Sequence, residues 1–408
     1  MNRVVVTGMA GLSPIGSSWQ TMKHNLRDGV TGIRYIDDWE KYPDLVAKLG
    51  APVTDFEKPA HYSRKQVRSM GRVALMSTRA TELALEDAGL LGDAMIEDGR
   101  MGVSYGSCSG STDALADFGG MLLNHGSSNL TANTYLRMMS HTAPVNIGVF
   151  FRLKGRVIAT STACTSGSQG IGYAYEAIKY GKQSMMVAGG AEELCPTQMA
   201  VFDTLYATST RNDQPEQTPR PFDQNRDGLV IGEGAATLIL EEREHAVARG
   251  ARIHAEIVGF GTNSDGMHVT QPDAGTMYTA MTLALQDAGL DAGQIGYVSA
   301  HGTATEKGDI AESQATQRLY GSSMPISALK SYTGHTLGAC GSLEAMAAIR
   351  MMNDGWFHGT ANLSQVDSDC AELNYLTGAG RELDVDYVMS NNFAFGGVNT
   401  SLIFSKNL

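Results

Sequence analysis

Long apolar runs and an excess of positive charge are both missing from this 408-residue sequence. No uninterrupted apolar stretch approaches the roughly 20 residues that a membrane-spanning helix needs, so we expect no membrane span. The chain carries 31 lysine and arginine residues against 43 acidic residues, which gives a formal charge of −12. Because there is no surplus of cations to neutralise phosphates, the composition argues against a nucleic-acid partner.

Cysteine is also scarce, and the five cysteines are odd in number, widely spaced and without a C-x-x-C pair. This pattern indicates neither a disulfide framework nor a zinc clip. The apolar run at the N-terminus is too short for a signal peptide. A cytoplasmic location, where thiols stay reduced, fits the sequence best.

The sequence does contain short β-branched runs that alternate with alanine-rich helical segments. The hydrophobic spacing predicts strands over residues 4–7, 101–105, 157–160, 185–187, 235–240, 255–259, 297–300 and 326–329. It predicts helices over residues 74–88, about 164–180, 279–288 and 342–352. The polar, Met-rich segment 124–145 is interpreted as an inserted cap or a partner surface.

The same order of strand, turn and helix recurs in the second part of the chain. The segment Gly234-Ala-Ala-Thr-Leu-Ile-Leu also aligns with Gly397-Val-Asn-Thr-Ser-Leu-Ile. We therefore expect a duplicated, layered α/β fold, with one half over residues 1–250 and the other over 251–408. Reactive side chains should gather at the carboxyl ends of its parallel strands.

The best candidate for a nucleophile is Cys164, in the segment Thr162-Ala-Cys-Thr-Ser-Gly-Ser, where a predicted strand gives way to a helix. A thiol has an ordinary pKa of about 8.5, and a helix N-terminus is expected to lower it by stabilising the thiolate. A structural buried cysteine is the alternative, and position alone does not decide between the two.

Two histidines supply the context, because His301 and His335 each follow a predicted strand beside a glycine, at corresponding places in the two modules. An imidazole N–H can donate to the oxyanion or enolate that forms when a thioester reacts. A zinc site built from Cys164 and both histidines is a weaker interpretation, because the three lie far apart without a short-spaced pair.

Lys330 follows the predicted strand 326–329, and a buried lysine needs an anionic partner. The candidate partners are Glu344, Asp309 and Glu312. A structural salt bridge that orients His335 is the alternative to a chemical role for this lysine.

The segment Ser390-Asn-Asn-Phe-Ala-Phe-Gly-Gly-Val-Asn is predicted to be a polar, aromatic and glycine-rich loop between two strands. Its backbone N–H groups are suited to an oxyanion hole, and an aromatic side chain there could close an acyl channel. For Phe393, packing in the core is the favoured interpretation.

Together, the motifs TACTSGS, HGTAT with the following GD and Glu, KSYTGHTLGACGSLE and NNFAFGGVN resemble those of the β-ketoacyl-acyl-carrier-protein synthases of the elongating type I/II group. The likeness extends along nearly the whole chain. It implies the thiolase fold, five layers (α-β-α-β-α) built from two duplicated halves, and an acyltransferase activity. The implied reaction is a decarboxylative Claisen condensation in which an acyl thioester on Cys164 is extended by two carbons from a malonyl carrier protein.

The resemblance also assigns roles to individual residues. It implies Cys164 as nucleophile, His301 and His335 as promoters of decarboxylation, and Lys330, held by Glu344, as structural or electrostatic support. The backbone N–H groups of Cys164 and Phe395 would form the oxyanion hole, with Phe395 as gate. Substrate contacts are expected from Thr303, Thr305, Ser109 and Phe393.

No metal or cofactor is implied, because the acyl and malonyl groups arrive on the phosphopantetheine of an acyl carrier protein. Arg64, Lys65 and Arg68 would form a basic patch for that acidic carrier. The family dimerises, so we expect a homodimer or a heterodimer with a related subunit.

Some positions depart from the family pattern. Ala394 replaces a glycine beside the gate, Glu306-Lys307 replace a proline and a small residue, and Tyr206 replaces a carrier-docking arginine. Ser109 replaces a bulky aliphatic residue of the pocket floor, which hints at a deeper or more polar cavity. These departures suggest a specialised synthase for polyene or polyketide-like chains.

Three other functions are weighed. A thiolase or starter synthase that uses coenzyme A thioesters would carry a second cysteine or an asparagine in place of one histidine. A non-catalytic, chain-length-determining partner subunit would lack the nucleophile. A Cys–His hydrolase would act without a malonyl donor.

Overall fold

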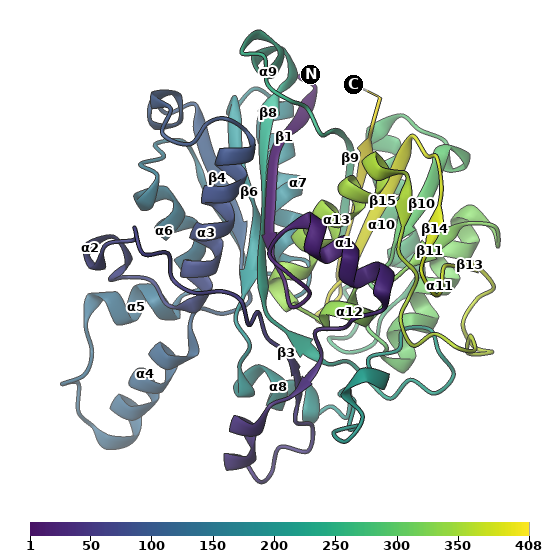
Figure 1. Cartoon of the computed structure of the whole chain (residues 1–408), viewed down its shortest axis with the longest axis horizontal. Coiled ribbons are helices and arrows are strands. Elements are labelled where there is room, and N and C mark those ends of the chain that lie inside the picture. The colour runs from purple at the N-terminus through teal and green to yellow at the C-terminus, as the bar shows by residue number, and fades with distance from the viewer. Residues whose placement is uncertain (408) are drawn as a thin grey trace.

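The computed structural model describes residues 1–407, and within them eleven strands form one mixed sheet that runs through the molecule (Figure 1). From one edge to the middle, the strands of the first half are β5 (Val157–Thr160), β4 (Met101–Gly106), β6 (Met185–Glu192), β8 (Gly234–Glu242) and β1 (Val4–Leu12). The second half continues with β9 (Ala255–Ser264), β16 (Val398–Ser405), β15 (Tyr387–Phe393), β10 (Ile295–Ser299), β11 (Pro325–Ser327) and β13 (Asn374–Tyr375).

The two halves of the sheet repeat one topology about the β1–β9 junction. In the first half β1 is antiparallel to β8, β8 is antiparallel to β6, and β6, β4 and β5 are parallel. In the second half β9, β16, β15, β10 and β11 pair in the same directions. The aligned segments that begin at Gly234 and Gly397 fall on β8 and β16, which hold equivalent places. The structure therefore confirms the duplicated α/β fold.

Helices separate and cover the two halves of the sheet. Between them lie α7 (Ser166–Lys179) and α13 (Cys340–Asp354), which contact each other and strands of both halves. The outer faces carry α3 (Arg72–Asp87) and α6 (Thr142–Phe150) on one side and α10 (Ala274–Ala288) with α11 (Glu306–Tyr320) on the other. The order of layers is thus helix, sheet, helix, sheet, helix (Figure 1).

The two central helices approach closely because small residues face each other. A side chain on Gly341 of α13 would meet the backbone nitrogen of Ser168 on α7 at 2.7 Å. A side chain on Gly167 would meet the carbonyl oxygen of Gly338 at 2.8 Å. Nearly every residue of α13 is buried, as expected of a helix enclosed on all sides. This contact brings the first turn of α7 against the segment that follows His335.

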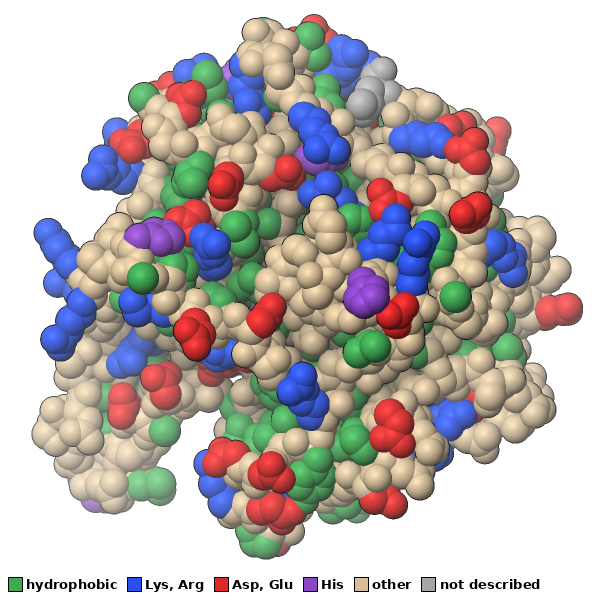
Figure 2. All heavy atoms as spheres, viewed as in Figure 1, with side chains coloured by type: hydrophobic (Ala, Val, Ile, Leu, Met, Phe, Trp, Pro, Cys, Tyr) green, Lys and Arg blue, Asp and Glu red, His purple; other side chains and the backbone are tan. Residues whose placement is uncertain are grey.

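Two helices of the first half have no counterpart in the second. Between β4 and β5 the chain forms α4 (Thr112–Asn124) and α5 (Ala132–Met138) before α6 packs on the sheet, whereas the second half has only α11 at the equivalent place. In the space-filling view α4 and α5 stand away from the body, with a hollow beside them (Figure 2). The predicted insertion is therefore helical, and its end, from residue 142 onward, belongs to the covering layer.

The remaining elements are short and lie around these layers. They are α1 (Trp19–Asp28), α2 (Arg64–Val67), α8 (Pro196–Asp203), α9 (Arg243–Ala248), α12 (Lys330–Thr333), β2 (Arg34–Tyr35), β3 (Leu49–Ala51), β7 (Ile231–Gly232), β12 (Trp356–Phe357) and β14 (Arg381–Glu382). No helix among residues 1–407 is both long and apolar enough to cross a membrane.

Two local predictions were wrong. The segment 390–399 is mostly a hairpin, in which Ser390–Phe393 continue β15 and Val398 begins β16, so only four residues turn between them. The strand predicted over 326–329 ends at Ser327, and Lys330 begins the single helical turn of α12. In both segments polar residues are buried, which hydrophobic spacing alone does not reveal.

Candidate active site

Cys164 lies in a tight turn between β5 and α7. The preceding Ala163 has φ +52°, in the left-handed region that non-glycine residues rarely adopt. The hydroxyl of Ser166 holds the turn by donating to the Ala163 carbonyl at 2.7 Å and accepting from the Thr162 N–H at 2.9 Å. The turn presents the Cys164 thiol, which is 4% exposed, to an internal cavity.

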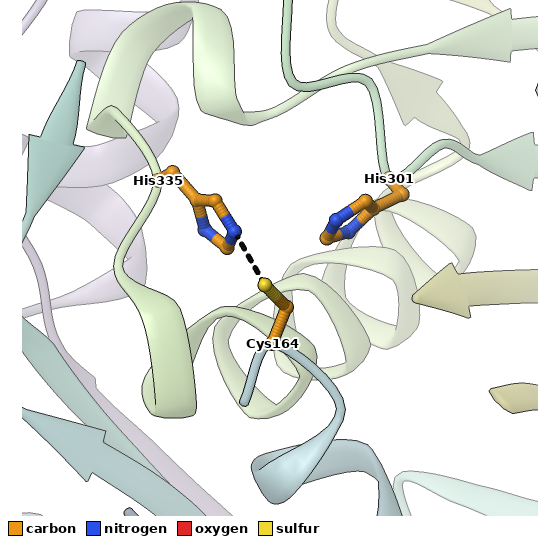
Figure 3. A group of neighbouring side chains, drawn as sticks. All are labelled: Cys164, His301 and His335. Carbon is orange, nitrogen blue, oxygen red and sulfur yellow. Dashed lines mark hydrogen bonds between the residues drawn. The ribbon is translucent and has the colours of Figure 1, made fainter. Parts of the chain in front are cut away.

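The Cys164 sulfur and the imidazoles of His301 and His335 point toward one another (Figure 3). Nε2 of His335 lies 2.9 Å from the sulfur, and the two imidazole rings are 5.2 Å apart in an edge-on arrangement. His335 follows α12, and His301 follows β10, so the second half of the fold supplies both rings to the cysteine of the first half.

The partners of both Nδ1 atoms fix which nitrogen carries the proton. Nδ1 of His335 accepts the backbone N–H of Leu337 at 3.2 Å. Nδ1 of His301 accepts from the ammonium of Lys330 at 3.1 Å, and the amide of Asn392 lies 3.4 Å from it. Since each neutral ring then carries its hydrogen on Nε2, both histidines can donate into the cavity.

Lys330 is fully buried and forms an ion pair with Glu344 on α13. The second carboxylate oxygen of Glu344 accepts from the side chain of Asn392 at 2.6 Å. The predicted pairing with Glu344 is therefore confirmed. The suggestion that Lys330 orients His335 was wrong, because the ammonium contacts His301.

The other two candidate partners, Asp309 and Glu312, do not pair with Lys330. Glu312 accepts the backbone N–H groups of His301 and Gly302, each at 2.7 Å. Asp309 accepts those of Thr303 and Ala304, each at 3.1 Å. Both carboxylates lie on α11 and hold the loop that carries His301, a role that their i, i+3 spacing did not predict.

Burial dominates the electrostatics of the site. It lowers the pKa of His301 and His335 well below the ordinary value, and the nearby Lys330 charge lowers them further, so both rings are neutral. Burial also raises the pKa of the Cys164 thiol, against the opposing effects of the Phe395 N–H, the Lys330 charge and its own N–H. The expectation that the helix terminus lowers this pKa was wrong for the resting enzyme.

A cavity of about 440 Å³ leads from Cys164 to the surface. His301, His335, Thr303, Thr305 and Phe395 line it, and so does Phe393, which also packs in the core as favoured. The hydroxyls of Thr303 and Thr305 are 2.9 Å apart on its wall. Phe395 is 39% exposed and faces Phe202 of α8 edge-on, with the ring centres 6.3 Å apart.

The expectation that Ser109 contacts substrate on the pocket floor was wrong, because Ser109 lies outside the lining of this cavity, in the turn that follows β4. Its hydroxyl accepts from the side-chain amide of Gln198 at 3.2 Å, and Gln198 is one turn before Phe202 on the same face of α8. The oxygen of that amide is buried without a hydrogen-bond partner. The contact between Ser109 and Gln198 therefore lies one helical turn from Phe202, which lines the cavity.

The three cations of the predicted docking patch, Arg64, Lys65 and Arg68, lie on or beside α2 and are exposed. Among the described residues, none of them has an acidic side chain within 4.0 Å. Tyr206 is 95% exposed at the mouth of the cavity.

Sequence reasoning missed Asn392, Leu337 and Gln198. Asn392 stood inside a quoted motif, and its place beside two other polar residues before an aromatic was a signal that a buried amide needs partners. Leu337 acts through its backbone N–H, and Gln198 lies in a segment without any motif. For these two residues the sequence carried no signal.

Comparisons with known proteins agree with this geometry. The models for Beta-ketoacyl synthase, N-terminal domain, and Beta-ketoacyl synthase, C-terminal domain, match residues 1–246 and 254–364. The chain is 38% identical to 3-oxoacyl-[acyl-carrier-protein] synthase 2 of Vibrio harveyi, over 99% of this chain and 98% of that protein.

Two solved structures extend the comparison. A beta-ketoacyl synthase from Burkholderia phymatum STM815 has a TM-score of 0.98 at 60% identity, with 99% of each chain covered. AntDE:AntF, a type II PKS acyl-carrier protein in complex with its ketosynthase bound to the hexaketide, has a TM-score of 0.87 at 28% identity, again with 99% of each chain covered.

Proposed function

The chain belongs to the β-ketoacyl synthase family and is a condensing acyltransferase of that family, and we propose that Cys164, His301 and His335 carry out its chemistry. The proposed reaction joins an acyl group held on Cys164 to two carbons derived from a malonyl group on an acyl carrier protein. The observation that carries the proposal is the convergence of one thiol and two Nε2–H donors on a single buried cavity.

The first step is acyl transfer to Cys164. The sulfur bonds to the acyl carbonyl carbon, the carrier thioester breaks, and the thiol proton of Cys164 passes to the departing carrier thiolate. Although burial raises the pKa of this thiol, the Lys330 charge and the Phe395 N–H oppose that rise and would stabilise the sulfur as it loses its proton. The exchange of one thioester for another needs no net base.

The second step is decarboxylation of the malonyl thioester. Its carbonyl oxygen would accept the Nε2–H groups of His301 and His335, which stabilise the negative charge as carbon dioxide leaves and an enolate forms. Two neutral rings suit this step, because each donates a hydrogen without carrying a charge of its own. Lys330 supports it by holding His301 in the donating tautomer.

In the third step the enolate carbon attacks the carbonyl carbon of the Cys164 thioester. The backbone N–H groups of Cys164 and Phe395 both oppose the rise in the pKa of the Cys164 thiol, and we propose that they also donate to the oxyanion of the tetrahedral intermediate. Collapse of that intermediate breaks the carbon–sulfur bond and releases a 3-oxoacyl chain two carbons longer on the carrier. Cys164 leaves as a thiolate, which takes up a proton from water to restore the thiol. Phe395, half-exposed between the cavity and Phe202, is placed to gate the acyl chain.

We propose that this chemistry needs no metal ion. Cys164, His301 and His335 are close enough together to hold one, because their donor atoms lie within 4.8 Å of one another. However, the Nδ1 atoms of both histidines face hydrogen-bond donors, which leaves hydrogen rather than a lone pair on each Nε2. Both substrates are proposed to arrive on the phosphopantetheine of the carrier, with Thr303 and Thr305 against that arm.

The proposed partners are an acyl carrier protein and a second subunit. The exposed cations Arg64, Lys65 and Arg68 suit an acidic carrier. A dimer is supported by β5, an edge strand with exposed residues, and separately by α4, where Leu122 and Leu123 are 74% and 81% exposed. We propose a homodimer in a reducing cytoplasm, with a related subunit as the alternative partner.

We propose further that the acyl chain is of a specialised, polyene or polyketide-like kind. The departures from the family pattern at Ser109, Ala394 and Tyr206 support this proposal. The contact between Ser109 and Gln198 places polar groups one helical turn from Phe202, which lines the cavity. A non-catalytic partner subunit is disfavoured by the intact nucleophile, and a thiolase by the two histidines.

The test is condensation by the purified enzyme with acyl carrier and malonyl carrier substrates, read by mass spectrometry of the products. Wild type should release a chain two carbons longer, and Cys164→Ala should release none. Undiminished extension by Cys164→Ala would refute the proposed nucleophile. Cys370→Ala is the matched control and should retain activity, because it changes a buried free thiol that precedes β13 and does not line the cavity.

A further inference from the structure

Glu192, at the end of β6, is a fully buried carboxylate that the proposed reaction does not use. One oxygen accepts the backbone N–H of Cys108 at 2.7 Å and that of Gly338 at 3.3 Å. The other faces the hydroxyl of Ser107 at 3.3 Å and the N–H of Ser109 at 3.5 Å. Glu192 thus joins the turn after β4 to the segment after His335.

No cation offsets this charge, since Glu192 forms no salt bridge with any of residues 1–407. Burial raises its pKa to about 7, against the opposing effect of the N–H groups. Enclosing a carboxylate without a counter-ion is costly unless several donors point at it. Four donors point at Glu192, and they tie the carboxylate to both segments.

The link to the active site runs through two residues, Leu337 and Gly338. Leu337 has φ +48°, a strained conformation for a branched side chain, and its N–H is the donor that holds Nδ1 of His335 at 3.2 Å. The next N–H along the chain, that of Gly338, points at Glu192. Anchoring Gly338 therefore holds Leu337 in the strained conformation that aims its N–H at the imidazole.

We propose that Glu192 is a positioning residue, which fixes the tautomer and direction of His335 through the backbone of Gly338 and Leu337. Without the carboxylate, the Gly338 N–H loses its acceptor and Leu337 can relax to an ordinary backbone conformation. Nδ1 of His335 then loses its donor, and the ring is free to carry its hydrogen on the wrong nitrogen. The Nε2–H that faces Cys164 and the malonyl carbonyl is lost in part of the population.

Gly338 is part of the same link between Glu192 and His335, and the space around it allows no side chain. A Cβ there would lie 2.8 Å from the carboxylate oxygen of Glu192 and 3.0 Å from the nitrogen of Cys108. The substitution Gly338→Ala would therefore push the carboxylate away while leaving its charge in place. It perturbs the same link from the opposite end.

The experiment compares Glu192→Met with Glu193→Met in the full-length enzyme. Glu193 is the neighbouring residue and is also buried, but it accepts from Thr112 at the start of α4 and has no bond to the site. Nitrogen-15 NMR of histidine-labelled protein reports the tautomer of His335, with the signals assigned by a His335→Gln variant. Malonyl decarboxylation and thermal unfolding are measured alongside.

In Glu192→Met we expect the His335 signals to shift toward a mixture of tautomers. We also expect kcat for decarboxylation to fall about 10- to 100-fold, which is the usual effect of losing a hydrogen bond to a charged group, while KM stays within about twofold. Gly338→Ala should show the same tautomer shift, and Glu193→Met should not. If Glu192→Met leaves the tautomer unchanged, the proposal is overturned, whether or not the protein loses stability or activity.

The proposal rests on the proposed function for its effect on kcat, but the tautomer of His335 can be read without any substrate. A wild-type enzyme that fails to decarboxylate malonyl thioesters would refute the function and leave the structural link standing. An unchanged tautomer in an active enzyme would refute the link and leave the function standing.

Discussion

The substitution Lys330→Met tests whether the buried ammonium keeps the histidines neutral. Methionine keeps most of the volume of the side chain and removes its charge, which lies 3.1 Å from Nδ1 of His301 and pairs with Glu344. We expect the pKa of His301 to rise toward neutral pH, because the repulsion by Lys330 is lost while the carboxylate stays nearby. A protonated His301 would no longer be held in the donating, neutral form.

The size of the effect follows from the geometry. Two unit charges about 4 Å apart interact by about 4 kcal/mol at an effective dielectric constant of about 20. The ammonium of Lys330 is closer than that to Nδ1, so removing it should change the protonation of His301 by a readily measured amount. The decarboxylation rate of the variant should therefore fall as the pH decreases, because a growing fraction of His301 becomes protonated.

The assay is release of carbon dioxide from malonyl carrier protein between pH 5.5 and pH 8.5. Wild type should show no loss of rate from His301 in this range, whereas Lys330→Met should acquire an acid limb. Lys179→Met is the control, because Lys179 also forms a half-buried ion pair, with Asp287, but faces away from the cavity. A variant whose pH profile matches that of wild type would contradict the assigned role of Lys330.

Three further predictions follow from other parts of the structure. His301→Ala should block malonyl decarboxylation while Cys164 is still acylated, and mass spectrometry of the acyl-enzyme checks this; loss of acylation with decarboxylation intact would contradict the assignment. Ser109 lies outside the cavity lining but contacts Gln198, one turn before Phe202, which does line it, so Ser109→Ile should displace this turn and shorten the accepted acyl chains. An unchanged preference across a panel of acyl carriers would contradict this link. Burial lowers the pKa of His358 to about 4, below the 6.5 of an unfolded chain. Between these two pH values the unfolded state binds more protons than the folded state. The free energy of unfolding should therefore fall as the pH drops below 6.5, by up to about 3 kcal/mol from this group. Urea unfolding at pH 7 and pH 5 should show a smaller loss for His358→Gln, and an equal loss would exclude His358 as its source.

The sequence predicted the layered, duplicated fold because hydrophobic spacing repeats in both halves and because the segments that begin at Gly234 and Gly397 align. The structure places these two segments on the equivalent strands β8 and β16. It also indicated Cys164, His301 and His335, since each stands beside small residues in the segment that follows a strand, although α12 lies between β11 and His335. Parallel strands of one sheet direct such residues to a common edge, so position along the chain carried information about position in space.

Motifs were less informative about which groups contact each other. The residues alone left Glu344, Asp309 and Glu312 open as partners of Lys330, and only the family resemblance named Glu344, which forms the ion pair. The other two face backbone N–H groups of the His301 loop, and nothing in their spacing separates an ion pair from a backbone bond. The tertiary structure decides which carboxylate pairs with Lys330, because Glu344 on α13 contacts the ammonium, whereas Asp309 and Glu312 on α11 contact the loop that carries His301.

What the sequence determined by itself is the order of strands and helices and the residue types that react, because periodicity and local turn chemistry are properties of the chain. What only the tertiary structure decided is the state of those residues. Burial, which raises the pKa of Cys164 and lowers those of the histidines, depends on how completely two halves close on each other. The tautomer of His301 depends on the ammonium of Lys330, 29 residues away along the chain, and that of His335 depends on the N–H of Leu337, which the local backbone conformation directs at the ring.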